Sequence, residues 1–135
     1  MDPFSPSKED YIKHIYLLIK QKGFARVSDI AELFDVYPAS VTKMIQILHK
    51  EGYLNYERYR GISLNSKGNE LGEYYATRHD SIEKFLTTIG VQSENILQNA
   101  DGIEHFVDTD ALNLIEAVTK FFANHPDSLE ILKRM

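Results

Sequence analysis

Apolar residues recur at helical spacing in the first third of this chain. A stripe in the first of these segments consists of Ile12, Ile15, Tyr16 and Ile19. It predicts a helix that begins at Ser5 or Ser7 and ends near Lys22, where Gly23 supplies a stop. A second, shorter helix is predicted from Ser28 to Phe34, with its apolar residues at the same spacing.

The third helix is predicted to begin at Pro38, because proline fits the first turn of a helix, and to end at Glu51-Gly52. Its apolar face consists of Val41, Met44, Ile45 and Leu48. Apolar and polar residues then alternate over 53–58 and 62–65, which is the period of a strand, with a turn at Tyr59-Arg60-Gly61. The order helix, helix, helix, hairpin predicts a winged helix-turn-helix with a two-stranded wing.

Helical spacing returns after the hairpin and continues through the chain. Ser66 is expected to cap a long helix that reaches about Thr88. Three further helices are predicted, one capped by Ser93 and covering 96–106, one from Asp108 or Asp110 to Ala123, and a short one capped by Asp127. The fold class is therefore mainly α, with a winged-helix DNA-binding domain at 1–70 joined to a helical domain at 71–135.

The composition limits the ligands, the charge and the cellular location that this protein can have. The sequence has no cysteine, so a transition metal would need His, Asp and Glu as ligands. Its formal net charge is −5, divided unevenly as about +2 through Lys67 and about −7 after it. The apolar runs are too short to span a membrane and the N-terminus lacks the pattern of a signal peptide, so we expect a cytoplasmic protein without membrane contact.

The start of the third helix has the side chains that a DNA-reading helix needs. Its outward positions are short or polar, and they are Ala39, Ser40, Thr42, Lys43 and Gln46. Such residues can approach base edges in the major groove, and Arg58 and Arg60 on the wing can bind phosphate or enter the minor groove. Each residue alone is equally compatible with a solvated surface. Together with the element order they predict binding to a double-stranded DNA operator, by a homodimer that spans two half-sites.

Acidic and histidine side chains form a second constellation. On a helix, Asp101, Glu104 and His105 share one face, which is a candidate divalent-cation site. His79 lies in the apolar stripe of the long helix, and Asp10 lies just inside the first helix. Taken alone, His79 is explained as a core histidine with satisfied hydrogen bonds, and Asp10 as an acid at a helix N-terminus. Only the combination of these residues points to a metal site.

Several separated motifs resemble one known family. They are Glu9-Asp10-Tyr11-Ile12, Ala25-Arg26-Val27-Ser28-Asp29-Ile30-Ala31, Ser40-Val41-Thr42-Lys43-Met44, Tyr59-Arg60-Gly61 and Gly102-Ile103-Glu104-His105. The chain is similar over nearly its whole length to the manganese transport regulators of the diphtheria toxin repressor family. This resemblance implies a homodimeric winged-helix repressor that dimerises through its C-terminal domain and binds metal between its domains.

The resemblance also implies a ligand set, namely Asp10, His79, Asp101, Glu104 and His105, with Asp101 replacing the family's usual glutamate. Lys13 departs from the family, because a second carboxylate is expected at that position. A charged ammonium group has no lone pair for a metal and repels a cation beside it. This departure has three possible consequences. The site holds only one ion, His14 substitutes as a ligand, or Lys13 itself takes the place of the metal.

The leading hypothesis is a DNA-binding repressor that responds to a divalent metal, most simply Mn²⁺ because the ligands are oxygen and imidazole, and that controls metal-uptake genes. The alternative is a winged-helix regulator that metal does not activate, in which Lys13 replaces the ion. A metallohydrolase would need an open coordination position and a general base in a substrate cleft. The sequence shows no such constellation, so we predict that the protein is not an enzyme.

Overall fold

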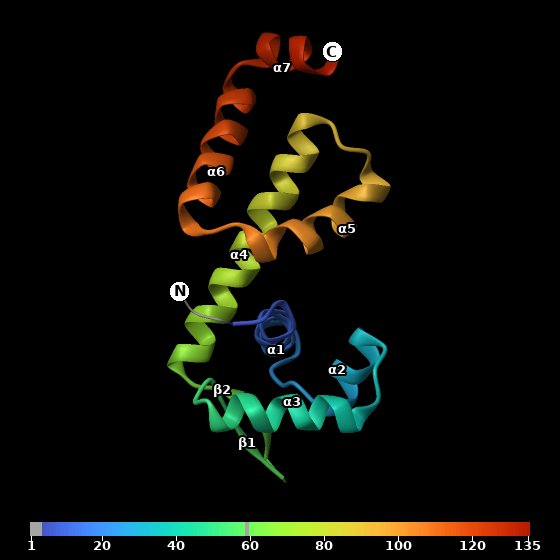
Figure 1. Cartoon of the computed structure of the whole chain (residues 1–135), viewed down its shortest axis with the longest axis vertical. Helices are drawn as coiled ribbons and strands as arrows, with labels where there is room; N and C mark the ends of the chain where they lie inside the picture. The colour runs from blue at the N-terminus through green and yellow to red at the C-terminus, as the bar shows by residue number, and fades with distance from the viewer. Residues whose placement is uncertain (1–3, 59) are drawn as a thin grey trace. The chain divides into compact units, whose positions relative to one another are not determined.

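The computed structural model describes residues 4–58 and 60–135, and within these ranges it is mainly helical with one short hairpin (Figure 1). The elements in chain order are α1 (Pro6–Lys22), α2 (Val27–Phe34), α3 (Pro38–Lys50), β1 (Leu54–Glu57), β2 (Gly61–Leu64), α4 (Ser66–Ile89), α5 (Ser93–Ile103), the 3-10 helix η1 (Glu104–Phe106), α6 (Thr109–Asn124) and α7 (Pro126–Lys133). The mainly helical winged-helix prediction is confirmed. Tyr59 of the predicted turn and Met1 to Pro3 lie outside the described residues.

The chain divides into two compact units, one that ends at Ala76 and one from Thr77 to Met135. The division falls inside α4, whose first half belongs to the N-terminal unit and whose second half belongs to the C-terminal unit. The predicted domain boundary at residue 70 stays a prediction. No helix in the described part of the chain has the length and apolar character needed to cross a membrane.

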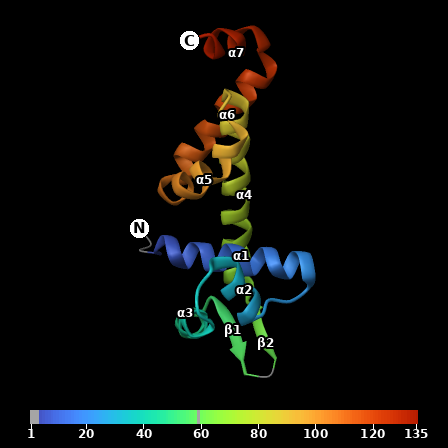
Figure 2. The same cartoon turned by 90° about the vertical axis from the view of Figure 1, so that its right-hand side faces the viewer.

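Helices α1, α2 and α3 lie together with the hairpin in the N-terminal unit (Figure 2), and their buried side chains form an apolar core. The side chains that are fully buried there include Ile12, Ile15, Ile30, Val41, Ile45 and Leu48. Tyr11 joins this core, and burial raises the pKa of its phenol. In α4 a Cβ atom on Gly72 would overlap the Tyr16 Cβ, so only glycine lets α4 approach α1 this closely.

The helix ends confirm some predicted caps and correct others. Ser5 caps α1, Gly23 ends it in the left-handed conformation with φ of 83°, and Asp108 caps α6 by accepting from the Ala111 N–H. Ser28 does not cap α2. The isolated bridge between Ala25 and Ile62 holds this segment extended, and the helix begins at Val27, one residue before Ser28.

Three other caps were wrong. Asn65, and not Ser66, caps α4, because its Oδ1 accepts from the Gly68 N–H at 2.9 Å. Ser93 is already the first residue of α5, after Gln92 in extended backbone. Asp127 lies in the first turn of α7, whose N-cap is His125. In each case the predicted cap lies inside the helix, where its acidic or hydroxyl side chain still suits the first turn.

The wing is an antiparallel pair of strands with Leu54 opposite Leu64 and Glu57 opposite Gly61. Leu54 and Ile62 are buried toward the core, whereas the alternate residues Asn55 and Ser63 are exposed. This alternation is the period of two that the sequence showed. It fixes the hairpin to the rest of the N-terminal unit.

Candidate nucleic-acid interface and metal centre

Helix α3 separates a buried face from an exposed one. Val41, Ile45 and Leu48 are fully buried, so the helix cannot rotate without exposing them. The opposite face carries the predicted DNA-reading residues. Ala39, Ser40, Lys43 and Gln46 are exposed and Thr42 is half-buried. The first turn of α3 contains no acidic residue, which suits an approach to phosphate.

The wing adds two arginines to this unit, both exposed. The Arg60 Nε lies 3.3 Å from the Glu57 Oε2, in a pair whose side chains are 85% and 60% exposed. An ion pair this exposed is weak, so it can exchange for a phosphate contact at little cost. Arg58 belongs to the same hairpin, directly after β1.

A histidine that the sequence analysis missed ties α3 to the wing. The backbone N–H of Tyr56 in β1 donates to the His49 Nδ1 at 3.1 Å. His49 lies in the last turn of α3, so this bond joins the helix to the hairpin. The sequence does not predict such a bond, because a histidine near a helix end accepts it only once the hairpin lies beside the helix.

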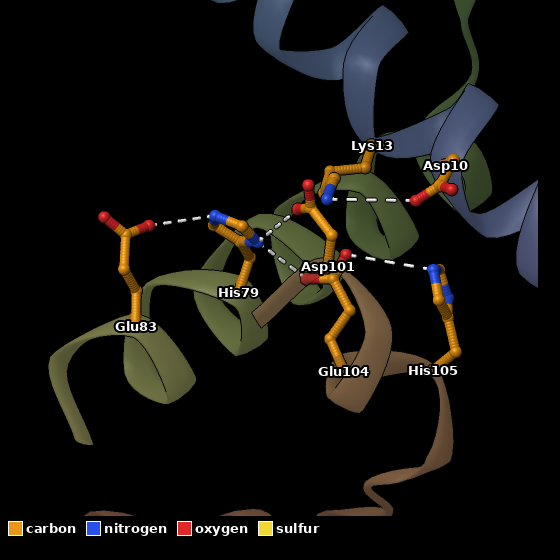
Figure 3. Close-up of polar contacts among 7 residues, drawn as sticks. All are labelled: Asp10, Lys13, His79, Glu83, Asp101, Glu104 and His105. Carbon is orange, nitrogen blue, oxygen red and sulfur yellow. Dashed lines mark hydrogen bonds and ion pairs between the residues drawn. The ribbon is translucent and has the colours of Figure 1, made fainter. Parts of the chain in front are cut away.

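The C-terminal unit brings three of the predicted metal ligands together (Figure 3). The His79 Nδ1 lies 2.8 Å from the Glu104 Oε2 and 3.5 Å from the Asp101 Oδ1. One ligand atom from each of these residues lies within 4.8 Å of the others. Glu104 is 1% exposed, and a buried carboxylate is expensive unless positive charge or hydrogen bonds compensate it.

The helix predicted over 96–106 is present, but only its first part is an α-helix. The α-helix ends at Ile103, and Glu104 to Phe106 form a 3-10 helix. The i, i+3, i+4 argument assumed α geometry throughout, so it did not fix how the three side chains point. Asp101 and Glu104 face His79, whereas His105 Nε2 lies 3.9 Å from the other oxygen of Glu104.

The remaining predicted ligand, Asp10, belongs to the N-terminal unit. On α1 the Lys13 Nζ lies 3.9 Å from the Asp10 Oδ1, one turn away. The Lys13 side chain is 5% exposed. A buried ammonium needs compensation by a negative charge, and Asp10 supplies part of it. Lys13 therefore lies next to Asp10, which the resemblance implies as a metal ligand.

Glu83 is a member of the cluster that the sequence analysis did not single out. Its Oε2 lies 2.9 Å from the His79 Nε2, on the ring edge opposite Asp101 and Glu104. The two residues are four apart on α4, which is the spacing of neighbours on a helix surface. That spacing was the available signal, but acid and histidine pairs at this distance are common on solvated helices.

The chemistry of the cluster fits a divalent cation. Two carboxylates and one imidazole supply oxygen and nitrogen donors, with no thiolate in the chain. Such a set suits Mn²⁺ and Fe²⁺ better than soft ions such as Cu⁺. Metal would also compensate the negative charge of the buried Glu104.

Comparison with known protein families gives two adjoining matches. Residues 3–62 match the iron dependent repressor N-terminal DNA binding domain. Residues 65–133 match the iron dependent repressor metal binding and dimerisation domain. The two models together cover nearly the whole chain, in the order that the sequence predicted.

Individual relatives agree with these matches. The HTH-type transcriptional regulator MntR of Listeria welshimeri is 51% identical over 97% of this chain and 92% of its own length. MntR of Geobacillus kaustophilus is 48% identical over 96% of this chain and 92% of its own. Among solved structures, the manganese regulator SloR is 27% identical with a TM-score of 0.75, over 87% of this chain and 55% of SloR, so this chain spans about half of that structure.

These relatives are regulators of transcription. They confirm the prediction of a DNA-binding repressor that is not an enzyme, and they give no support to a metallohydrolase or to the metal-independent alternative. The chain belongs to the iron dependent repressor family, in which a DNA-binding domain is joined to a domain for metal binding and dimerisation.

Proposed function

We propose that this repressor responds to Mn²⁺ bound at His79, Asp101 and Glu104, and that the ion controls its affinity for a DNA operator of metal-uptake genes. The observation that carries the proposal is the convergence of these three side chains, of which the Glu104 carboxylate is nearly fully buried. The oxygen and imidazole donors and the similarity to a manganese regulator support Mn²⁺ over softer metals. His105 and Asp10, the other ligands that the resemblance implies, stay predictions.

The DNA contacts are assigned to the exposed face of α3 and to the wing. Ser40, Thr42, Lys43 and Gln46 would read base edges or bind phosphate, with Ala39 leaving room for close approach. Arg58 and Arg60 would bind the backbone beside them. Their exposure beside a rigid apolar core supports this assignment, because a reading helix must present its side chains from a fixed position.

The metal dependence can be tested with DNA selected from a randomised duplex library in the presence of Mn²⁺. We expect the enriched duplex to bind about 5- to 150-fold more tightly with Mn²⁺ than after chelation, which is the usual range of coupling between two sites. The measurement is fluorescence anisotropy at fixed physiological salt, since phosphate contacts make affinity salt-dependent. Equal affinities with and without Mn²⁺ would reject the proposal.

The number of ions is proposed to be one per chain. Lys13 places an ammonium group beside Asp10, and this positive charge disfavours a second cation there. Elemental analysis after equilibration with Mn²⁺ should give one ion per chain. Lys13→Glu should raise the count to two, whereas Lys20→Glu, an exposed lysine on the same helix, should leave it unchanged. Two ions in the parent protein would contradict the single-ion proposal.

The C-terminal unit is proposed to form a homodimer. Within the segment that matches the dimerisation domain, several large apolar side chains are exposed, namely Leu97, Phe106, Leu114 and Phe121. A monomer that left these residues in water would lose the free energy of burying them. Sedimentation should show a dimer, and Leu114→Asp should weaken it by at least about tenfold. A dimer unaffected by Leu114→Asp would exclude α6 as its interface.

A further inference from the structure

The imidazole of His79 is held from both of its edges (Figure 3). Its Nδ1 faces Glu104 and Asp101 at 2.8 and 3.5 Å, and its Nε2 lies 2.9 Å from Glu83. The His79 side chain is 15% exposed, whereas that of Glu83 is 45% exposed. The ring therefore has a defined orientation within the C-terminal unit, with different partners on its two nitrogens.

Only one of the two ring nitrogens of His79 can bind an ion. A neutral imidazole offers one lone pair to a metal, and its other nitrogen carries the proton. The ion would lie on the Nδ1 edge, where both candidate carboxylates are. The proton must then be on Nε2, and a ligating histidine commonly donates that proton to a carboxylate, which fixes the tautomer and makes the ring a better ligand.

Glu83 lies outside the group of ligand atoms formed by His79, Asp101 and Glu104. Its carboxylate contacts the Nε2 edge, and one ring cannot direct both of its nitrogens at the same ion. Glu83 and His79 are one turn apart on α4, so helix geometry alone keeps the two side chains within reach.

We propose that Glu83 is a positioning residue of the metal site, which accepts the Nε2 proton of His79 and thereby presents the Nδ1 lone pair to the ion. This inference rests on the proposed function, because it requires an ion at His79, Asp101 and Glu104. It assigns Glu83 an action through His79 and not a contact with the metal. The loss of such a supporting carboxylate typically lowers metal affinity about 10- to 100-fold.

The test compares three variants of the full chain by titration with Mn²⁺, in which the electron paramagnetic resonance signal of free Mn²⁺ gives both affinity and ion count. We expect Glu83→Ala to weaken binding about 10- to 100-fold with the count unchanged. Glu83→Gln keeps an oxygen acceptor for the Nε2 proton and should recover most of the loss. Asp80→Asn removes an exposed carboxylate next to His79 in sequence and should bind like the parent.

A second readout follows the proton itself. In protein loaded with Zn²⁺, a diamagnetic substitute for Mn²⁺, the Nε2 proton of His79 should exchange slowly with solvent in the parent and faster in Glu83→Ala. A lower ion count in Glu83→Ala would identify Glu83 as a ligand of the ion. An unchanged Mn²⁺ affinity in this variant would show that Glu83 does not position His79. Either result overturns the inference. If the parent protein binds no Mn²⁺, the proposed function has failed as well.

Discussion

The two units of this chain are built from different interiors. The N-terminal unit packs a continuous apolar core, in which Ile12, Ile30 and Ile45 are fully buried. The C-terminal unit has a smaller set of buried apolar side chains, and among the described residues it buries the carboxylate of Glu104 and the guanidinium of Arg78, whereas the buried charged residue of the N-terminal unit is Lys13. Apolar burial stabilises a structure without a ligand, whereas a buried carboxylate needs a compensating charge.

Large apolar side chains are exposed in both units. On α6 of the C-terminal unit, Leu114 and Phe121 are 62% and 47% exposed. In the N-terminal unit Tyr37, which directly precedes α3, is 83% exposed. The comparison teaches that the two units differ in what they bury. The N-terminal unit holds α3 on the larger apolar core, whereas the C-terminal unit builds its carboxylate and histidine cluster around the buried Glu104.

The largest effect is expected from a substitution in the apolar core of the N-terminal unit. Ile45→Ala should lower the free energy of unfolding of the N-terminal unit by about 2–5 kcal/mol, because it removes fully buried methylene and methyl groups. All eight tyrosines lie at or before Tyr75 and the chain has no tryptophan, so tyrosine fluorescence during urea unfolding reports on this unit.

The control for this experiment is Ile47→Ala on the same helix, where the side chain is 37% exposed and the loss should be clearly smaller. Comparable losses for the two variants would show that the apolar core does not dominate the stability of this unit.

A change in the charged cluster should act on metal and leave the apolar core intact. Glu104→Gln removes one negative charge from the proposed site, so we expect Mn²⁺ affinity to fall by at least about 100-fold, which is roughly 2.7 kcal/mol. Tyrosine-detected unfolding without metal should stay close to that of the parent. The measurements are isothermal titration with Mn²⁺ and the same urea series.

Glu94→Gln serves as the matched variant, because Glu94 is an exposed glutamate in the first turn of α5 and outside the cluster. If Glu94→Gln weakened Mn²⁺ as strongly as Glu104→Gln, general loss of negative charge would explain the result and the cluster would not.

The smallest expected effect concerns the link between α3 and the wing. His49→Leu removes the acceptor of the Tyr56 N–H, and one such bond contributes about 0.5–1.5 kcal/mol. Exposure lets water replace part of it, so the loss of stability should lie near the lower limit. DNA affinity should fall modestly, since the wing is then less fixed to the reading helix. His49→Gln, whose amide oxygen can accept the same bond, should restore both, and failure of that rescue would argue against the link.

The sequence by itself determined the order of elements in this protein. Periods of 3.6 and 2 in the apolar residues gave the helices and the wing, because those periods follow directly from backbone geometry. The fully buried residues Val41, Ile45 and Leu48 were predicted as the core face of α3. The candidate metal ligands His79, Asp101 and Glu104 were also predicted, from their chemical type and from the resemblance to a known family.

Only the tertiary structure decided how the cluster is arranged. The two oxygens of Glu104 face different histidines, one His79 and the other His105, and the direction of a carboxylate leaves no mark in residue periodicity. The same holds for the caps, since Asn65 and Ser66 are equally good candidates in sequence. The bonds of Glu83 to His79 and of His49 to Tyr56 depend on side-chain direction, which is set by packing and not by spacing alone.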